Sequence, residues 1–527
     1  MAETTGANGE ARRKRTELLK SALFRWLIFL QLLALIIFAY VKVGELLISQ
    51  TNYTPKDVHG GDQSHNMRLA TQTRPDLNPD FSKGFSKAMS GFFPHRTDGV
   101  VQPLWPWISA WFVKDGHVIE EADMVAKRVD QDDYGLFTRG RWFNVFFTAT
   151  VLAMVGIAAA RIFTVPAACN IVLLGGFGAL LPRAVYFQPE PLYFVLFFLT
   201  WLACVSALKH NTLWVYGLIG VLGGLAYLAK ASIAPLLMVF VGVSTLRCFW
   251  EIYSARRRGF VLGGSNLWHW RNHLVGLIIL AMMHLLTAGP RLAESQEKFG
   301  SMTHSFPSYW MWMDRFDPDC IQWMDQHNTR DELEAMNPAD RPSLGKYLST
   351  HTREEFVTRL KDGTWNRVTE FLWPKQTKRS DKLEKQKPWR GVLEWRGIYL
   401  GWLGLILVGM LFALRKAPAQ PENAGHVVFR HGTVVTLLFV VGCVATYSLA
   451  YGWYAPIARG SGDRFMLSLY LPLVFSMVWG AEAILRRVQR RQGSVYIMRG
   501  YLAAQWVLFA MVAWRLVEIL RSPQFYN

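Results

Sequence analysis

The stretch "WLIFLQLLALIIFAYV", residues 26–41, contains no charged side chain. A second stretch, "VVTLLFVVGCVATYSLAYGW" at 434–453, is equally apolar. About 20 such residues in a helix cross the roughly 30 Å of hydrocarbon in a bilayer. In a chain of 527 residues that is 51% hydrophobic and only 18% charged, repeated stretches of this kind predict an all-α protein that crosses a membrane several times.

Eleven apolar segments predict about eleven transmembrane helices, within a range of ten to thirteen. The segments are 23–48, 142–163, 166–183, 191–208, 213–229, 231–250, 272–289, 396–414, 433–452, 465–485 and 500–520. Two long hydrophilic stretches, 49–138 and 290–395, separate them. The predicted organisation is a cytoplasmic tail at 1–22, a transmembrane module at 23–289 that includes the loop 49–138, a helical cap at 290–395, further transmembrane helices at 396–520 and a tail at 521–527.

Basic residues favour the cytoplasmic ends of transmembrane helices. If the N-terminus is cytoplasmic, the short inner connections contain twenty Lys and Arg residues, and the short outer ones contain four: Arg183, Lys230, Arg459 and Arg464. This asymmetry predicts a cytoplasmic N-terminus and places both long loops on the extracytoplasmic face. The net charge of +18 has the same origin, because its basic tracts flank apolar segments, so nucleic acid is not an expected partner.

The second long loop, 290–395, predicts a small helical cap on the membrane surface. Thr352 and Glu355 have the spacing of a capping box and mark a helix start. Three groups of apolar residues recur at helical spacing. They are Leu344, Tyr347 and Leu348, then Phe356, Val357 and Leu360, then Trp365, Val368, Phe371 and Leu372.

A polar segment, "HGGDQSHNMR" at 59–68, follows the first apolar segment. Asp62 comes directly after two glycines, and at a membrane surface its carboxylate suits a general base or an electrostatic partner for developing positive charge. Gln63 and His65 are accessory polar groups beside it. Asp62 taken alone is more simply explained as a solvated loop aspartate.

An acid and a cation stand close together at another helix end on the same predicted face. Glu190 lies between two prolines in "YFQPEPLYFVLFF" (186–198), with Arg183 and Gln188 nearby. A helix N-terminal acid favoured by the macrodipole is the alternative explanation for Glu190.

Cations also mark two further helix ends on that face. Asp463 and Arg464 begin the tenth segment in "GSGDRFMLSLYLP" (460–472), and Lys230 ends the fifth in "YLAKAS" (227–232). An arginine there can hold a phosphate through charge-assisted hydrogen bonds. A snorkelling arginine paired with its neighbour is the alternative.

"QPLWPW" (102–107) is too short to span and predicts an interfacial helix anchored by its indoles. Such a helix would place Gln102, Arg96 and His95 at headgroup depth.

No metal site is expected. "DPD" (317–319) resembles a metal-binding acidic pair but lacks a doubly wound domain around it. His59, His65 and His95 match no compact zinc pattern with Asp62. The five cysteines are expected to be packing residues.

In their order and shared sidedness, these features resemble the GT-C class of membrane glycosyltransferases, such as protein O-mannosyltransferases and the enzyme that adds aminoarabinose to lipid A. The chain departs from the family pattern at Gln63, where a Glu is usual, and has His65 and Asn66 where a tyrosine is usual. The marks that carry the resemblance are "GGDQSHNM" (60–67), "QPLWPW" (102–107), "TRGRWFN" (138–144), "QPEPLYFVLFF" (188–198), "GVLGGLAYLAKAS" (220–232) and "GDRFMLSLYLP" (462–472).

The resemblance implies transfer of a sugar from a polyprenyl-phosphate donor to a glycan, lipid or protein acceptor, with inversion and without cofactor or metal. It implies Asp62 as general base and Glu190 as a group that orients the acceptor or stabilises oxocarbenium character. The groups that it implies for stabilising the leaving phosphate are Lys230, Arg464 and Arg183. The residues that it implies on the acceptor side or as accessories are Gln63, His65, Gln102 and Asp463.

A polytopic transporter or lipid flippase with an extracytoplasmic polar gate is the alternative function, and a non-catalytic assembly scaffold is a third. A transport path calls for ionisable residues near the middle of the spans, whereas this chain carries its charges near the segment ends. The basic tracts fit a bacterial inner membrane, with membrane lipids as partners. The endoplasmic reticulum remains open as the other location.

Overall fold

The computed structural model describes residues 3–50, 58, 61–78, 82, 92–257, 267–373, 395–408, 425–458, 462–492 and 495–521. Within these residues the regular structure is helical, without a strand. Nine of the described helices are long and apolar enough to cross a membrane by length and composition. Two shorter apolar helices, Leu213–Ala229 and Trp395–Val408, stand at the fifth and eighth predicted segments. By the length and composition of its helices, the prediction of a polytopic helical membrane protein is therefore confirmed.

Long helices form the apolar bundle, and shorter ones form the two hydrophilic loops. The bundle contains α1 (Glu3–Gln50), α7 (Gln131–Ile162), α8 (Val165–Gly175), η3 (Gly176–Leu180), α9 (Leu181–Ala184), α10 (Glu190–His210), α11 (Leu213–Ala229), η4 (Ala231–Ile233), α12 (Ala234–Arg257), α13 (Leu267–Phe299), α20 (Gly425–Trp453), η7 (Gly462–Leu469), α21 (Tyr470–Gln492) and α22 (Val495–Arg521). The loops contain α3 (Asp62–Thr73), η1 (Arg74–Leu77), α5 (Leu104–Ala110), α6 (Glu121–Ala126), α14 (Phe306–Trp310), η5 (Phe316–Cys320), α15 (Ile321–Gln326), α16 (Arg330–Ala335), α17 (Leu344–Thr350) and α18 (Arg353–Leu372).

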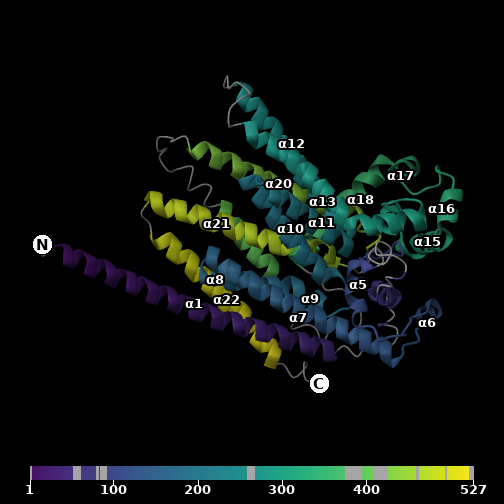
Figure 1. Ribbon diagram of the computed structural model, residues 1–527, viewed down its shortest axis with the longest axis horizontal. Coiled ribbons are helices and arrows are strands. Elements are labelled where there is room, and N and C mark those ends of the chain that lie inside the picture. Colours follow the sequence, from purple (N-terminus) through teal and green to yellow (C-terminus); the bar gives the residue numbers. More distant parts are fainter. Residues whose placement is uncertain are drawn as a thin grey trace.

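Both hydrophilic loops lie at one end of the bundle. Figure 1 shows the long helices running side by side, with α5, α6 and α15 to α18 gathered at one end and the start of α1 at the other. We call the first of these the loop-bearing end. The described parts of the two loops therefore lie at the end of the bundle opposite the start of α1, and the compartment that each end faces stays a prediction. The expected tail at 1–22 is helical from Glu3, in line with the first span.

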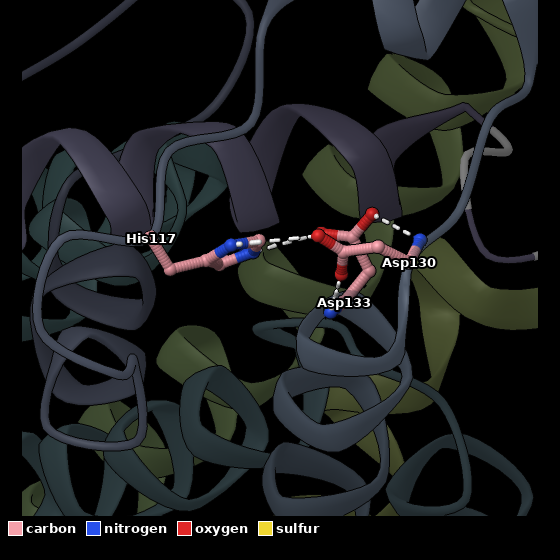
Figure 2. Close-up of side chains that lie close together, drawn as sticks. All are labelled: His117, Asp130 and Asp133. Carbon is pink, nitrogen blue, oxygen red and sulfur yellow. Dashed lines mark hydrogen bonds and ion pairs between the residues drawn. The ribbon is translucent and has the colours of Figure 1, made fainter.

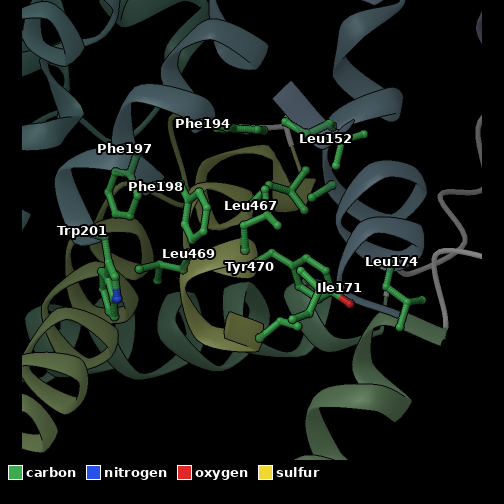
Figure 3. Packing of buried hydrophobic residues seen from close by; sticks show 14 of the residues in the cluster. Leu152, Ile171, Leu174, Phe194, Phe197, Phe198, Trp201, Leu467, Leu469 and Tyr470 are labelled. Carbon is green, nitrogen blue, oxygen red and sulfur yellow. The ribbon is translucent and has the colours of Figure 1, made fainter. Parts of the chain in front are cut away.

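The centre of the bundle is formed by the third and fourth spans in chain order. In the spans Val165–Ala184 and Glu190–His210, 89% and 78% of the most apolar stretch is buried within the protein, against 22–56% in the other seven described spans. Aromatic side chains of α10 fill the space towards its neighbours, where Trp201 lies 4.9 Å from Phe439 and Phe198 lies 5.6 Å from Phe475, measured between ring centroids. Figure 3 shows Phe194, Phe198 and Trp201 of α10 together with Leu467, Leu469 and Tyr470. This buried packing fixes the start of α10 at the loop-bearing end.

Two glycines let α11 approach α13 closely. A Cβ on Gly220 would lie 2.5 Å from the carbonyl oxygen of Leu280, and a Cβ on Gly224 would lie 2.6 Å from Cβ of Thr287. No larger side chain fits without moving a helix. This close contact fixes α11 along the axis of α13, and thus fixes the position of Lys230, which follows the last residue of α11.

The described part of the second loop, up to Trp373, contains the helices that its periodicity predicts, and its place on the membrane surface stays a prediction. The capping box is present: the Thr352 hydroxyl accepts a hydrogen bond from the Glu355 N–H, and the Glu355 carboxylate accepts one from the Thr352 N–H. The second and third groups of apolar residues belong to one helix, α18. Arg359 of α18 donates through Nε to the carbonyl of Trp453 at 3.1 Å, so the cap is attached to the end of α20.

The segment "QPLWPW" is helical as α5, but its environment differs from the prediction. Trp105 is fully buried, with its ring centroid 5.3 Å from that of Phe187 and 6.1 Å from that of Phe143. The expectation of a lipid anchor is wrong for this indole, because Trp105 packs against α7 and the segment before α10.

The five cysteines are free and buried, which agrees with the packing role expected of them.

Candidate functional site

Four charged residues from four separate segments meet at the loop-bearing end. Arg464 donates through Nη2 to Oδ2 of Asp62 at 2.8 Å, and Lys230 donates through Nζ to Oε1 of Glu190 at 2.8 Å. Nε of Arg464 lies 3.9 Å from the same Oε1 of Glu190, so the two pairs share one network. We call Asp62, Glu190, Lys230 and Arg464 the ionic cluster. All four are residues that sequence patterns single out.

The ionic cluster is closed at one side and open at the other. The side chain of Glu190 is 2% exposed, those of Arg464 and Lys230 are 17% and 22% exposed, and that of Asp62 is 39% exposed. A carboxylate as enclosed as Glu190 needs paired cations to compensate its lost hydration. Asp62 is the most exposed member, and we call its exposed side the rim of the cluster.

An aromatic layer supports the two cations. Lys230 Nζ lies 5.1 Å and the Arg464 guanidinium 4.9 Å from the centroid of the Phe465 ring. Tyr451 stacks on Phe465 at 5.1 Å and Tyr454 meets it edge-on at 6.0 Å. Cations held over a ring are attracted by its quadrupole.

Local backbone geometry places Asp62 at the first turn of α3. Gly61 has a φ of 52°, a value that glycine adopts without strain, and it precedes the helix as its N-cap. The Asn66 side-chain amide donates to the Asp62 carbonyl. An acid in the first helical turn is stabilised by the macrodipole. The other glycine of the pair, Gly60, lies outside the described residues.

The segment before Glu190 is held by side chains of α7 and α3. Arg141 donates through Nε to the Val185 carbonyl at 2.7 Å, and Asn144 donates through Nδ2 to the carbonyls of Tyr186 and Gln188 at 3.1 Å. These bonds satisfy the carbonyls of Val185, Tyr186 and Gln188 and fix the direction in which α10 begins. Sequence patterns mark the TRGRWFN tract without assigning Arg141 this positioning role.

Gln63 belongs to the same support. Its Oε1 accepts the N–H of Phe187 at 3.0 Å, and the side chain is buried. Gln63 therefore joins α3 to the segment before Glu190, and the structure does not direct this acceptor atom towards the open rim.

Gln102 lies away from the ionic cluster. Its Oε1 accepts a hydrogen bond from Nε of Arg291 at 3.0 Å. Arg291 also donates to the carbonyls of Met302 at 2.9 Å and His304 at 2.7 Å. This buried guanidinium joins the first loop to the end of α13, so Gln102 serves as part of the joint between the two loops.

The remaining predicted site residues have different surroundings. His65 pairs through Nδ1 with Oδ2 of Asp98 at 2.7 Å, one turn after Asp62 in α3. Arg183 in α9 lies close enough for its charge to act on Glu190. Asp463 is part of η7, and its side chain lies outside the described part of the structure. Nδ1 of His95 faces the Phe93 carbonyl at 2.7 Å.

A second group of ionisable side chains, which sequence patterns do not reveal, lies at the start of α7. His117 Nε2 lies 2.9 Å from Oδ1 of Asp133, and its Nδ1 lies 3.8 Å from Oδ2 of Asp130, as Figure 2 shows. Among the described residues, only these three offer His, Cys, Asp or Glu ligand atoms that lie within 4.8 Å of one another in a set of three.

These two aspartates already serve as a helix cap. Asp130 Oδ1 accepts the Asp133 N–H at 2.7 Å, and Asp133 Oδ2 accepts the Asp130 N–H at 3.2 Å. The remaining oxygens face the imidazole. The geometry is that of a capping box joined to a histidine, and the Asp130–Asp133 spacing is the signal from which a cap could have been predicted.

A cavity of about 380 Å³ lies at the end of α22, lined by Trp514, Val517, Glu518 and Arg521. None of these residues belongs to the ionic cluster. The open rim at Asp62 is therefore the feature of interest, and it combines two acids with two cations over an aromatic layer. No protein-family model matches the chain, and no curated protein sequence matches it significantly.

Proposed function

We propose that the protein is an integral membrane glycosyltransferase of the GT-C type. It moves a sugar from a polyprenyl-phosphate donor to a hydroxyl of a glycan, lipid or protein acceptor at the loop-bearing end, which the basic-residue asymmetry predicts to be extracytoplasmic. The observation that carries the proposal is the ionic cluster, in which Asp62 and Arg464 share an ion pair at an accessible rim. A base beside fixed cations is the arrangement that this reaction requires.

In the proposed reaction the acceptor hydroxyl attacks C1 of the sugar. The O–H bond breaks, the glycosidic bond forms, and the bond from C1 to the phosphate oxygen breaks with its electron pair going to the phosphate. Asp62 takes the proton, and the attack from the opposite face inverts C1. A positioned base contributes about 10²–10⁴-fold in rate.

Lys230 and Arg464 stabilise the charge that grows on the leaving phosphate, with Arg183 as a further cation near Glu190. Fixed cations in a water-poor site act more strongly than in bulk water. Glu190 holds Lys230 in place through its 2.8 Å contact and orients the acceptor or supports oxocarbenium character. Lys230 and Arg464 provide the charge compensation at the leaving phosphate.

The distribution of charge in the spans supports an enzyme at the surface more than a transport path. In the nine described spans, Asp, Glu, Lys and Arg occur towards the helix ends and are absent from the central part. A transporter that moves ions or charged substrates usually places ionisable groups at the bilayer midplane.

The test is sugar transfer by the purified full-length chain. Radiolabelled polyprenyl-phosphate sugars are incubated with candidate acceptors, and label in the acceptor is counted for the wild type, Asp62→Asn and the control Asp314→Asn. Asp314 is a matched control because it also pairs with an arginine, Arg359, at 3.2 Å, but in the cap. We expect transfer by the wild type and by Asp314→Asn, and a loss of about 10²-fold or more in Asp62→Asn.

Full turnover by a folded Asp62→Asn protein would refute Asp62 as the base. Facilitated movement of an intact lipid-linked sugar across a vesicle membrane, without transfer, would favour the flippase.

A further inference from the structure

The cations of the ionic cluster are already occupied in the structure. Arg464 contacts Asp62 and Lys230 contacts Glu190, each at 2.8 Å, so two positive and two negative charges compensate one another. A donor phosphate that needs these cations meets carboxylates in the positions that its own oxygens would take. Binding of the donor therefore requires an exchange of partners within the cluster.

The two ion pairs differ in how easily they separate. Glu190 is buried almost completely and lies near a second cation, since Nε of Arg464 is 3.9 Å from its Oε1. Separation of a buried carboxylate from its cations is costly. Asp62 is the most exposed member and can regain water when it leaves Arg464, and exposed pairs contribute little to stability. The Asp62–Arg464 contact is therefore the ion pair that separates more easily.

The side chain of Asp62 can turn away from Arg464 without a movement of α3, because it is 39% exposed. It occupies the first turn of α3, directly after Gly61, whose Cβ position is open with no atom within 4 Å. Arg464, by contrast, is held over Phe465 and between two acids. The arginine thus stays while the carboxylate leaves.

We infer that the phosphate of the donor displaces Asp62 from Arg464, and that this displacement frees the Asp62 carboxylate to accept the proton of the acceptor hydroxyl. The exchange presupposes the proposed transfer reaction and adds an order to it, with donor binding before acceptor activation. While the donor is absent, the base is occupied by Arg464. No covalent bond changes in this step, because a carboxylate and a phosphate merely exchange places on one guanidinium.

This exchange has a consequence that distinguishes it from simple donor binding. If Asp62 competes with the phosphate, removal of its charge strengthens binding of a phosphate ligand while it abolishes transfer. The gain should be up to about five-fold, since a partly exposed pair contributes up to about 1 kcal/mol. If Asp62 instead helped to hold the donor, the same substitution would weaken binding.

The experiment measures binding of a polyprenyl monophosphate without sugar to the full-length protein in nanodiscs. Wild type, Asp62→Asn, Asp62→Ala and Asp314→Asn are compared, with the uncharged polyprenol as the lipid-only ligand and inorganic phosphate as the headgroup-only ligand. Thermal unfolding confirms that each variant is folded. We expect both Asp62 variants to bind the monophosphate more tightly than the wild type, by up to about five-fold. We expect Asp314→Asn to match the wild type and polyprenol binding to be equal in all four.

Unchanged or weaker monophosphate binding in both Asp62 variants would overturn the exchange, even if the wild type transfers sugar. A wild type that binds polyprenol and its monophosphate equally, and transfers no sugar, would overturn the proposed function as well. If inorganic phosphate shows the same gain as the lipid phosphate, the headgroup alone drives the exchange. A gain confined to the lipid phosphate means that the exchange occurs only with the tail in place.

Discussion

Arg464 and Asp62 stand 402 positions apart in the chain, and a 2.8 Å hydrogen bond from Nη2 to Oδ2 joins them. The bond connects the start of the span Arg464–Arg487 to the first turn of α3, which lies in the first loop. Nε of the same guanidinium lies 3.9 Å from Oε1 of Glu190, so one arginine bonds to one candidate acid and lies near the other. Its removal should therefore affect the handling of the donor more than any other single change at the site.

Replacement of Arg464 by Ala should impair use of the donor more than use of the acceptor. A charge-assisted hydrogen bond contributes about 1.5–3 kcal/mol, which corresponds to a fall of roughly 10- to 100-fold in kcat/KM for the donor. Steady-state kinetics with each substrate varied in turn make the measurement. Arg330→Ala is the control, because Arg330 pairs with Glu334 on the exposed surface of the cap. If Arg464→Ala changed the acceptor KM more than the kinetics with the donor, Arg464 would belong to the acceptor site instead.

Glu190 and Lys230 should behave as a coupled pair in stability. Glu190→Gln leaves Lys230 without its 2.8 Å partner beside another cation, and we expect a loss of about 2–4 kcal/mol in the free energy of unfolding. Lys230→Met in the same protein removes the uncompensated charge, so the double variant should regain part of that loss. Unfolding in detergent of the four proteins of the cycle gives the coupling energy. Additive single effects would mean that the contact contributes nothing of its own.

The pair of His65 and Asp98 should stabilise the first loop in a pH-dependent way. Burial lowers the pKa of His65. The hydrogen bond to Asp98 and the charge of Asp98 raise the pKa by more than burial lowers it, so the pKa of His65 lies above its ordinary value of 6.5. Burial raises the pKa of Asp98, but His65 and the N–H groups of Val101 and Val100 lower it, and the result lies below the ordinary 3.8.

The sign of the pH effect follows from these two directions. The contribution of His65 is full below about pH 6.5 and is lost as the pH rises through its raised pKa, whereas that of Asp98 is lost as the pH falls through its lowered pKa. The stability difference between wild type and Asp98→Asn should therefore be largest between about pH 4 and 6.5 and should shrink above that window. Unfolding measured from pH 4 to 9 tests this. A difference that is independent of pH would contradict the pairing.

The cap should depend on Gly363. A Cβ at this position would overlap the carbonyl of Gly452 in α20, so Gly363→Ala must push α18 away from the end of the span. We expect faster proteolysis within 344–373 and a loss of about 1–3 kcal/mol, as for other overpacked sites. Gly345→Ala is the matched control, because the nearest atom to its Cβ position is Oγ of Ser343 at 3.9 Å. Equal proteolysis of the two variants would show that the cap is not held by this contact.

Much of the ionic cluster was predictable because its members share a local signal. Asp62, Glu190, Lys230 and Arg464 each stand at a helix end on the face that the basic-residue pattern assigns to the loops. Residues at the same face of a bundle can meet, and the structure brings these four together. The roles of Gln63 and Gln102 were not predictable, because an amide at the same depth can point to the rim or to a distant backbone, and nothing nearby in the chain indicates which.

The sequence by itself determined that the chain is helical, that it crosses a membrane many times and that its unusual charges share one face. These properties depend on apolar stretches and helix ends, which are local and can be read residue by residue. Only the tertiary structure decided that Arg464 pairs with Asp62, that Glu190 is enclosed with Lys230, and that Arg141 and Gln63 hold the segment before α10. Which residues pair depends on the lengths and rotations of α10 and of the span Arg464–Arg487 relative to their neighbours. Packing between residues hundreds of positions apart sets these lengths and rotations.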